Sequence, residues 1–365
     1  MALVNITTVG CNQTRSTLGC NFTYQKEKNN STNIDWTKIG LFFERLEISM
    51  KILLTFIIIS TILGNTMVLI ATWKERSLHQ PNKYFIACLA VADLLVGLVL
   101  APLKVYQMRH DNVSRSKMSI HLCRFMVWID TFALTTSIYT LTFISFDRYL
   151  KISKPLQYKS LMTSSIATKV IFIIIFISTA FATYSATPQS GSSGILITGN
   201  GPCLQADPRE YYLLLFISVF LLPILVISIM YALIFLVAHR RQKRWQNGEL
   251  GQTSTNLNEQ TATLRQDMKV IRMLVIIMGV FILCWSPWFV LISYLLFGDL
   301  LNLNKWYKNM SDIYWGNIIY QAANTLPLFN SLCNPIIYAW LDQKYREAFK
   351  HLFRQTVSWF RSRIR

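Results

Sequence analysis

Long runs of apolar residues, separated by shorter polar stretches, dominate the sequence. Seven runs reach about 18 residues or more, the length of a helix that crosses the hydrocarbon core of a bilayer. They cover residues 52–73, 84–103, 122–146, 170–187, 211–238, 273–298 and 313–340. Lipid offers the backbone no hydrogen-bond partner, so a spanning segment is a helix or part of a closed barrel, and no run alternates strictly as a barrel strand does. The pattern therefore predicts an all-α membrane protein, a bundle of seven transmembrane helices.

The polar segments divide the chain into three regions. Residues 1–50 form a tail without an apolar run of signal-peptide length, so we expect the first span to act as the insertion signal. Residues 51–341 hold the bundle, and within it residues 240–265, rich in Gln, Asn and Thr, are predicted to form a flexible cytoplasmic loop. Residues 342–365 are predicted to form a short amphipathic helix and tail on the inner membrane surface. The apolar face of that helix would consist of Tyr345, Ala348, Phe349, Leu352 and Phe353.

Glycosylation sequons and basic residues both indicate how the bundle is oriented. An odd number of spans puts the two chain ends on opposite sides of the membrane. All Asn-x-Ser/Thr sequons fall on the amino-terminal side, at Asn5, Asn12, Asn21, Asn29, Asn30, Asn112 and Asn309. Most of the 36 Lys and Arg residues fall on the other side, which the positive-inside rule assigns to the cytoplasm. We therefore expect a plasma-membrane protein with an extracellular amino terminus, glycosylated at Asn5, Asn12, Asn21 and Asn30.

The composition excludes several classes of protein. Hydrophobic residues make up 52% of the chain and charged residues only 15%, against about 25% charged residues in soluble proteins. The net charge of +18 would suggest nucleic acid on a soluble chain, but here we expect membrane lipid and no nucleic acid as a partner. The seven cysteines are scattered singly, and the five histidines lie outside the spans or at their edges, so we expect no metal site and no enzyme centre.

Two acidic residues lie inside predicted spans, where an ionised side chain costs about 2.5–3.5 kcal/mol at a helix centre. Asp93 lies near the middle of the second span, and Ser137, Asn330 and Ser331 are polar residues that could surround it. One interpretation is a buried acid satisfied by these hydroxyl and amide groups. The other is a cation site that would hold an allosteric sodium ion. We expect no cofactor.

Asp130 lies near the outer end of the third span, two turns inward of Cys123. At 1.5 Å per residue it is about 25 Å from Asp147 at the inner end. We expect no Lys or Arg of the spans to face Asp130, because Arg124 lies nearly two turns further out. The carboxylate would then bind an external cation, or it would simply line a water-filled polar mouth. A cation of the chain itself beside Asp130 would contradict the first interpretation.

Six short motifs occur in the order of the spans. They are Gly64-Asn65, Leu89-Ala-Val-Ala-Asp93, Asp147-Arg148-Tyr149, Pro223 with Tyr231, Phe281-x-x-Cys284-Trp285-x-Pro287, and Asn334-Pro335-x-x-Tyr338. With these motifs, each in its own helix, the chain resembles a rhodopsin-like (class A) G-protein-coupled receptor from about Leu53 to Phe353. The resemblance implies an extracellular ligand, a heterotrimeric G protein as the cytoplasmic partner, and arrestin and a receptor kinase as further partners.

The resemblance also implies roles for individual residues. Arg148 would pair with Asp147 in the resting state, and Asp267 is either a second partner or an acid that reaches water. The activation switch would consist of Asp147, Arg148, Tyr149, Tyr231, Phe281, Pro287, Asn334, Pro335 and Tyr338. Tyr231 and Tyr338 would meet through water once the helices rearrange. Cys123 and Cys203 match the family's outer disulfide, whereas a Cys11–Cys20 bridge stays open.

Within this family, Asp130 resembles the acid that pairs with the ligand ammonium in biogenic-amine receptors. Trp285, Trp288 and Phe289 would then offer cation–π contacts, and Asn324 a polar contact. Other positions depart from that group. The usual Tyr, Trp and Gly are replaced by Leu328, Thr325 and Pro327, and Val219, Phe216 and Leu215 stand where catecholamine receptors place serines.

These departures leave several classes of ligand possible, and a transporter is the alternative class of protein. A histamine-like or trace amine is one ligand, and a cationic peptide or another non-amine molecule is the alternative. A transporter would also carry intramembrane acids and broken helices, but the sequence shows no repeated halves. An intramembrane enzyme would need a paired nucleophile and base or a histidine cluster, and the five histidines lie outside the spans or at their edges. We therefore predict a receptor for an extracellular amine-like cation.

Overall fold

The computed structural model describes residues 36–74, 83–113, 119–187, 196–197, 204–205, 209–246, 254–297 and 310–364. It separates into two compact units, Met1–Lys51 and Ile52–Arg365. The described part of the first unit is helical and carries an ion pair between Lys51 and Glu47, one helical turn apart. The second unit contains the helix bundle, and the site described below lies within it.

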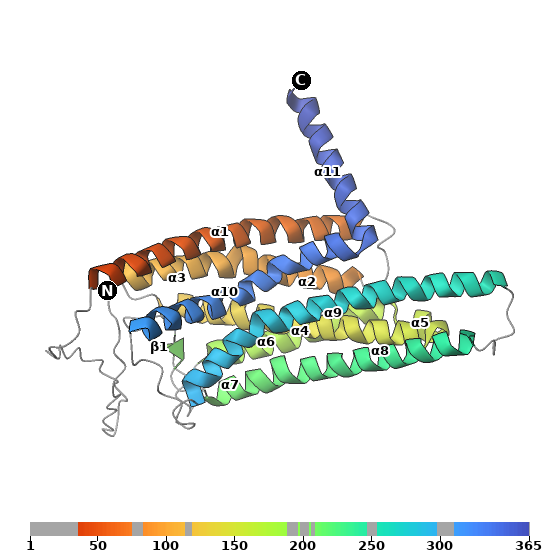
Figure 1. The fold of residues 1–365 in the computed structure, drawn as a ribbon, viewed down its shortest axis with the longest axis horizontal. Coiled ribbons are helices and arrows are strands. Elements are labelled where there is room, and N and C mark those ends of the chain that lie inside the picture. The colour runs from red at the N-terminus through yellow and green to blue at the C-terminus, as the bar shows by residue number, and fades with distance from the viewer. Residues whose placement is uncertain are drawn as a thin grey trace. The chain divides into compact units, whose positions relative to one another are not determined.

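The bundle is built from helices that run side by side (Figure 1). The elements are α1 (Trp36–Lys74), α2 (Lys83–Leu95), the π-helix η2 (Val96–Leu100), α3 (Ala101–Val113), α4 (Ile120–Ser153), α5 (Pro155–Leu161), α6 (Ser164–Ala186), α7 (Arg209–Leu215), the π-helix η3 (Phe216–Leu221), α8 (Leu222–Gln246), α9 (Ser254–Phe297), α10 (Met310–Leu341) and α11 (Gln343–Ile364). Two short strands, β1 (Leu196–Ile197) and β2 (Leu204–Gln205), pair antiparallel.

The seven predicted spans all lie on long helices. They correspond to α1, α2 to α3, α4, α6, α7 to α8, α9 and α10. Within the described residues, six of them are long and apolar enough to cross a membrane. The seventh, α10, has 32 residues but is more polar, because it carries several Asn, Gln, Ser and Thr residues. The prediction of an all-α membrane bundle is confirmed.

The predicted loop at residues 240–265 is wrong over most of its length. Helix α8 continues to Gln246 and α9 already begins at Ser254, so the segment outside the described residues spans only 247–253. The extension of α8 has a simple physical cause, because the Arg, Gln and Lys residues of 240–246 form good helices in water. No proline interrupts residues 240–265, but the Ser, Thr and Asn residues at the start of α9 have no such propensity. The two glycines of this stretch, Gly248 and Gly251, both fall between the helices.

Each π-helical segment ends two residues before a proline. Pro102 follows η2 and Pro223 follows η3, each as the second residue of the next α-helix. Proline has no amide hydrogen and its ring clashes with the carbonyl one turn earlier, so a regular turn is strained there. The wider turn is visible in the amide of Ala101, which donates to Val96 five residues back, and in that of Leu222, which donates to Ile217.

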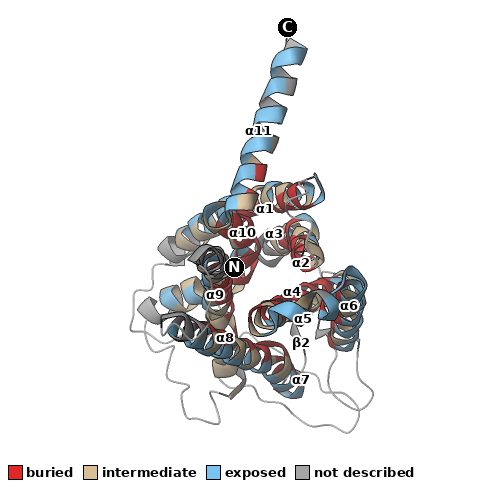
Figure 2. Cartoon of the chain, turned by 90° about the vertical axis from the view of Figure 1, so that its right-hand side faces the viewer, coloured by how far each residue is buried: buried red, intermediate tan, exposed pale blue. Residues whose placement is uncertain are grey.

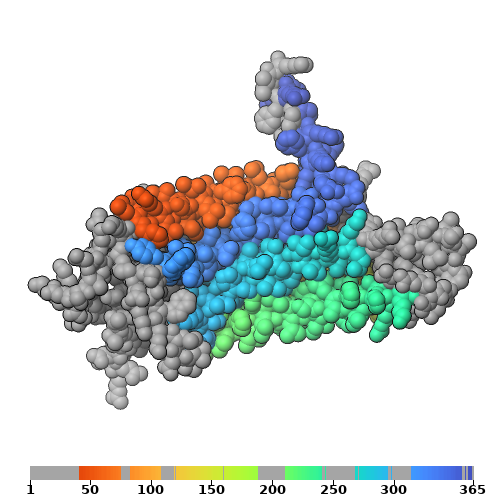
Figure 3. Space-filling model, in the orientation of Figure 1, coloured from red at the N-terminus to blue at the C-terminus, as the bar shows by residue number. Residues whose placement is uncertain are grey.

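The buried residues lie mainly on the inward faces of the helices (Figure 2). Helix α4 is central, because its most apolar segment is 61% buried, whereas that of α6 is 22% buried. Phe172 and Phe176 of α6 are exposed apolar side chains that suit contact with lipid. In the space-filling view, α10 lies between α9 and the portion of α1 after residue 52 (Figure 3).

The predicted amphipathic segment after the bundle is helix α11. Tyr345 and Ala348 on its apolar face are buried, and Phe349 packs against them, whereas Phe353 is exposed. The Tyr345 hydroxyl lies 2.9 Å from the Thr72 hydroxyl of α1. The first turns of α11 are thus attached to the inner end of the bundle.

Candidate functional site

The outer part of the site is an ion pair between two helices. Asp130 of α4 faces the bundle, and its Oδ2 atom lies 3.6 Å from Nζ of Lys104 on α3. The side chains of Lys104 and Asp130 are 27% and 38% exposed, so solvent reaches both. The expectation that no basic residue of the spans faces Asp130 is therefore wrong. The carboxylate is not free, although the separation exceeds the roughly 2.7–2.9 Å of a charge-assisted hydrogen bond.

Lys104 could have been found from the sequence if the end of the second span had been placed further along the chain. The second span was placed at residues 84–103, one residue short of Lys104, whereas the helix continues to Val113. Lys104 follows Asp93 by 11 residues, about three turns, which returns it to roughly the same inward face. The π-helix between them alters that direction in a way that periodicity alone does not reveal.

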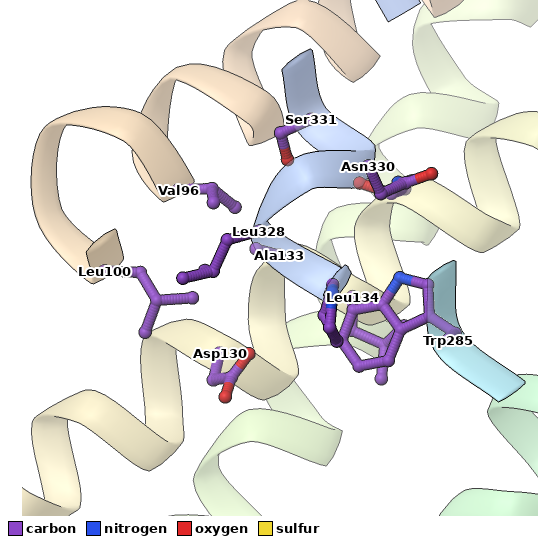
Figure 4. Close-up of a pocket in the computed structure, with 11 residues that line it drawn as sticks. Val96, Leu100, Asp130, Ala133, Leu134, Trp285, Leu328, Asn330 and Ser331 are labelled. Atoms are coloured by element: carbon purple, nitrogen blue, oxygen red, sulfur yellow. The ribbon is translucent and has the colours of Figure 1, made fainter. Parts of the chain in front are cut away.

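A small cavity continues inward from Asp130 (Figure 4). Its volume is about 20 Å³, enough for about one water molecule or a monatomic ion. Leu328 lies between Asp130 and Ser331 in the view of Figure 4, and the indole ring of Trp285 borders the same space. Ser137 and Asn330, predicted near a cation, also line it. An organic ligand is larger than this space, and Asp130 is reached by solvent from its exposed outer side.

The predicted aromatic residues form a packed wall between α9 and the helix pair α7 and η3. Phe289 is 1% exposed, and its ring centroid lies 4.3 Å from that of Phe220. Trp288 meets Phe289 edge-on at 5.0 Å, and Trp285 lies 6.1 Å from Phe281. Of the three aromatic residues predicted to contact the ligand, Trp285 borders the cavity beside Asp130, whereas Trp288 and Phe289 do not line it. The predicted cation–π contacts of Trp285, Trp288 and Phe289 with a ligand stay a prediction.

Two further polar side chains of the outer half are engaged with the protein itself. The Asn324 amide donates to the backbone oxygen of Tyr320, one turn earlier in α10. Sequence reasoning did not single out Tyr211, a partly buried residue of α7 whose hydroxyl lies 3.2 Å from that of Thr131. Because Thr131 is adjacent to Asp130 in the chain, this contact braces α4 next to the ion pair.

The middle of the bundle holds a buried polar network. Asn334 donates through Nδ2 to Oδ2 of Asp93 at 2.8 Å. Asn65 of α1 donates to the backbone oxygen of Ser331 at 3.0 Å. Asp93 is fully buried, and within the described residues its Oδ1 atom has no partner in hydrogen-bond geometry. An acceptor left open in this way is compatible with either the cation or the satisfied-acid interpretation once a water or an ion fills it.

The inner end holds the predicted Asp147–Arg148 pair. Arg148 Nη2 lies 3.2 Å from Asp147 Oδ2, and both side chains are almost fully buried. Tyr158 of α5, which the sequence did not single out, donates to Oδ1 of Asp147 at 2.8 Å. Among the described residues, Nε of Arg148 has no hydrogen-bond partner. The side chain of Asp267 lies outside the described residues, so its pairing stays a prediction.

The two predicted switch tyrosines have separate partners. Ser145 donates to the Tyr231 hydroxyl at 3.1 Å, which links α4 to α8. Tyr338 is buried, and its ring stacks on that of Tyr345 at 5.4 Å. Their predicted meeting through water stays a prediction.

The remaining predicted switch residues lie where the sequence placed them. Pro287 lies inside α9, and Pro335 lies inside α10. Tyr149 packs beside a small cluster formed by Ile152, Ile234 and Ile271 at the inner ends of α4, α8 and α9. The switch roles of these residues stay predictions.

The covalent predictions concern residues at the outer end. Cys123 is disulfide-bonded, but Cys203 lies outside the described residues, so their pairing stays a prediction. Cys11, Cys20 and the sequons at Asn5, Asn12, Asn21, Asn29, Asn30 and Asn309 also lie outside them. The described residues contain no cluster of His, Cys, Asp and Glu that could hold a metal ion.

The fold and the site define a class of membrane receptor. Residues 64–338 match the family described as "7 transmembrane receptor (rhodopsin family)". The chain therefore belongs to the rhodopsin family of G-protein-coupled receptors, which are receptors rather than enzymes.

Individual relatives are similar over most of the chain. The histamine H2 receptor of Canis lupus familiaris is 30% identical over 315 residues, which cover 84% of this chain and 80% of that protein. The trace amine-associated receptor 7e of Rattus norvegicus is 27% identical and covers 81% and 79%. The neuromedin-U receptor 2 of the same species is 25% identical and covers 88% and 79%. Their names refer to different ligands, so the family alone does not define the ligand of this chain.

Proposed function

We propose that this receptor lies in the plasma membrane with its amino terminus outside, binds a small extracellular molecule through an ammonium group, and activates a heterotrimeric G protein. Asp130 is the observation that carries the proposal. It is an acid on the inward face of the central helix α4, near the outer end and accessible to solvent. Arrestin and a receptor kinase are further proposed partners at the cytoplasmic side.

Lys104 contradicts the first interpretation as the sequence suggested it, in which Asp130 has no cation of the chain beside it. We therefore revise that interpretation, so that the ligand ammonium competes with Lys104 for Asp130. A partly exposed ion pair contributes only about 0–1 kcal/mol. A hydrogen bond to a charged group contributes about 1.5–3 kcal/mol. A ligand ammonium at hydrogen-bond distance from Asp130 therefore outweighs the 3.6 Å contact with Lys104. The proposed ligand binds by replacing this contact.

The bundle offers a physical connection from Asp130 to the cytoplasmic end. The cavity beside Asp130 touches Trp285 on α9 and Asn330 on α10. Both helices contain an internal proline and pack against each other. Ligand binding would shift the balance between two arrangements of these helices and release Arg148 for the G protein.

A non-amine ligand such as a peptide is the second candidate. It is favoured by Lys104, which already balances the charge of Asp130. Among the relatives, the neuromedin-U receptor 2 is named for a ligand other than an amine.

A screen of small primary and tertiary amines tests the proposal. Membranes that contain the receptor and a purified G protein are assayed for guanine-nucleotide exchange. We expect at least one amine to stimulate exchange, Asp130→Glu to retain part of the response, and Asp130→Asn to lose it at equal surface expression. An amine that is equally potent on wild type and Asp130→Asn would reject Asp130 as the amine site.

A further inference from the structure

The Lys104–Asp130 pair has properties that a plain amine site lacks. Two opposite charges on different helices face each other with 3.6 Å between Nζ and Oδ2. Neither side chain is buried, and the pair is too long to satisfy either group by a close hydrogen bond. The ammonium of Lys104 has three donor hydrogens and the carboxylate of Asp130 has several acceptor positions, so each can take a further partner.

The charge of the pair determines which ligand it recognises. A ligand with only an ammonium is attracted by Asp130 but repelled by Lys104, which lies beside the same atom. A ligand with only a carboxylate is attracted by Lys104 but repelled by Asp130. A molecule with both groups on the same carbon presents two opposite charges about as close together as those of the protein pair. It gains both contacts and leaves no charge unpaired.

We infer that Lys104 and Asp130 together form a binding site for a zwitterionic ligand, in which Asp130 accepts from the ligand ammonium and Lys104 donates to the ligand carboxylate. This inference rests on the proposed function, because it keeps Asp130 as the ammonium site and adds Lys104 as a second contact. An α-amino acid is the simplest ligand of this class.

The surroundings of the pair favour a ligand that approaches from outside. The cavity on the inner side has a volume of about 20 Å³ and is lined mainly by apolar side chains such as Leu100 and Leu328. It accepts nothing larger than about one water molecule. The charged groups of the ligand therefore stay at Lys104 and Asp130, at the exposed end of the site.

Matched pairs of probes that differ only in the carboxylate test the inference. The probes are histidine with histamine, tyrosine with tyramine, tryptophan with tryptamine, and phenylalanine with phenethylamine, together with the methyl esters of the four amino acids. Nucleotide exchange is measured on wild type, Lys104→Gln, Lys104→Arg and Asp130→Asn, with surface expression checked for each. Lys169→Gln, which removes an exposed lysine near the start of α6, is the matched control.

We expect one amino acid to act on wild type at a concentration about 10-fold or more below that of its amine and its ester. Lys104→Gln should abolish this preference, Lys104→Arg should retain most of it, and Lys169→Gln should leave it unchanged. Asp130→Asn should lose the response to both members of the pair.

The contrary outcomes separate the inference from the proposed function. If amines act as well as amino acids on wild type, or if Lys104→Gln keeps the preference, the inference is overturned. A loss of the amine response in Asp130→Asn would still support the proposed function in that case. An undiminished response of Asp130→Asn rejects both, and silence of every probe on wild type overturns the inference.

Discussion

The contact between Gly64 of α1 and Pro335 of α10 yields a quantitative prediction for the substitution Gly64→Ala. A Cβ atom at position 64 would lie 2.9 Å from Cβ and 3.0 Å from Cγ of Pro335. Non-bonded carbon atoms prefer about 3.5–4.0 Å. The proline ring cannot rotate away, so the two helices must separate. Overpacking of this kind costs about 1–3 kcal/mol, and the neighbouring hydrogen bond from Asn65 to Ser331 would lengthen as well.

The assay is thermal unfolding of the purified receptor in detergent, with Gly279→Ala of α9 as the matched control. An added Cβ at Gly279 meets nothing within 4 Å, and alanine in a helix is favoured over glycine by about 0.8–1.0 kcal/mol. We expect Gly64→Ala to lower the melting temperature and Gly279→Ala to keep or raise it. Equal melting temperatures for Gly64→Ala and wild type would refute the close-packing argument.

Three further substitutions test the polar contacts. Tyr158→Phe removes the 2.8 Å bond to Asp147, so we expect ligand-free nucleotide exchange to rise by up to about 10-fold; unchanged basal exchange would contradict a resting clasp. Asp93→Asn should weaken the effect of sodium on agonist affinity, and identical sodium titrations of mutant and wild type would count against a bound cation. Burial raises the pKa of the Tyr345 phenol, and the stability linked to this shift is present below the unfolded pKa of about 10 and is lost as pH rises through the folded pKa. Melting temperature should therefore fall more steeply above about pH 10 in wild type than in Tyr345→Phe, and parallel curves would show that this phenol is not the group responsible.

The spans were predictable because each depends on a local property. A helix in lipid must be apolar over about 18 residues or more, and seven such runs can be counted directly. The pair of Asp147 and Arg148 was predicted from the resemblance to the receptor family, since adjacent side chains of a helix do not normally face each other. Tyr158 was not, because its contact with Asp147 depends on the short helix α5 that follows.

The contact between Lys104 and Asp130 could not be predicted from the sequence. Whether Lys104 faces Asp130 depends on the end of the second span and on the turn geometry of η2. A hydropathy pattern does not define the exact residue at which a helix ends. It also carries no sign of a π-turn, except that Pro102 must be accommodated somewhere. The cavity and the aromatic wall depend on packing between distant helices, which no single segment specifies.

The proposed signalling requires that a ligand at Asp130 moves the inner end of α9. Spin labels at Lys154→Cys, directly after α4, and Lys269→Cys, on α9, occupy two exposed positions at the inner end. Their separation is measured by pulsed electron resonance in nanodiscs, with and without the most potent activator of the screen. We expect a longer distance with the activator in wild type and no change in Asp130→Asn. The same distance distribution in wild type with and without the activator would contradict it.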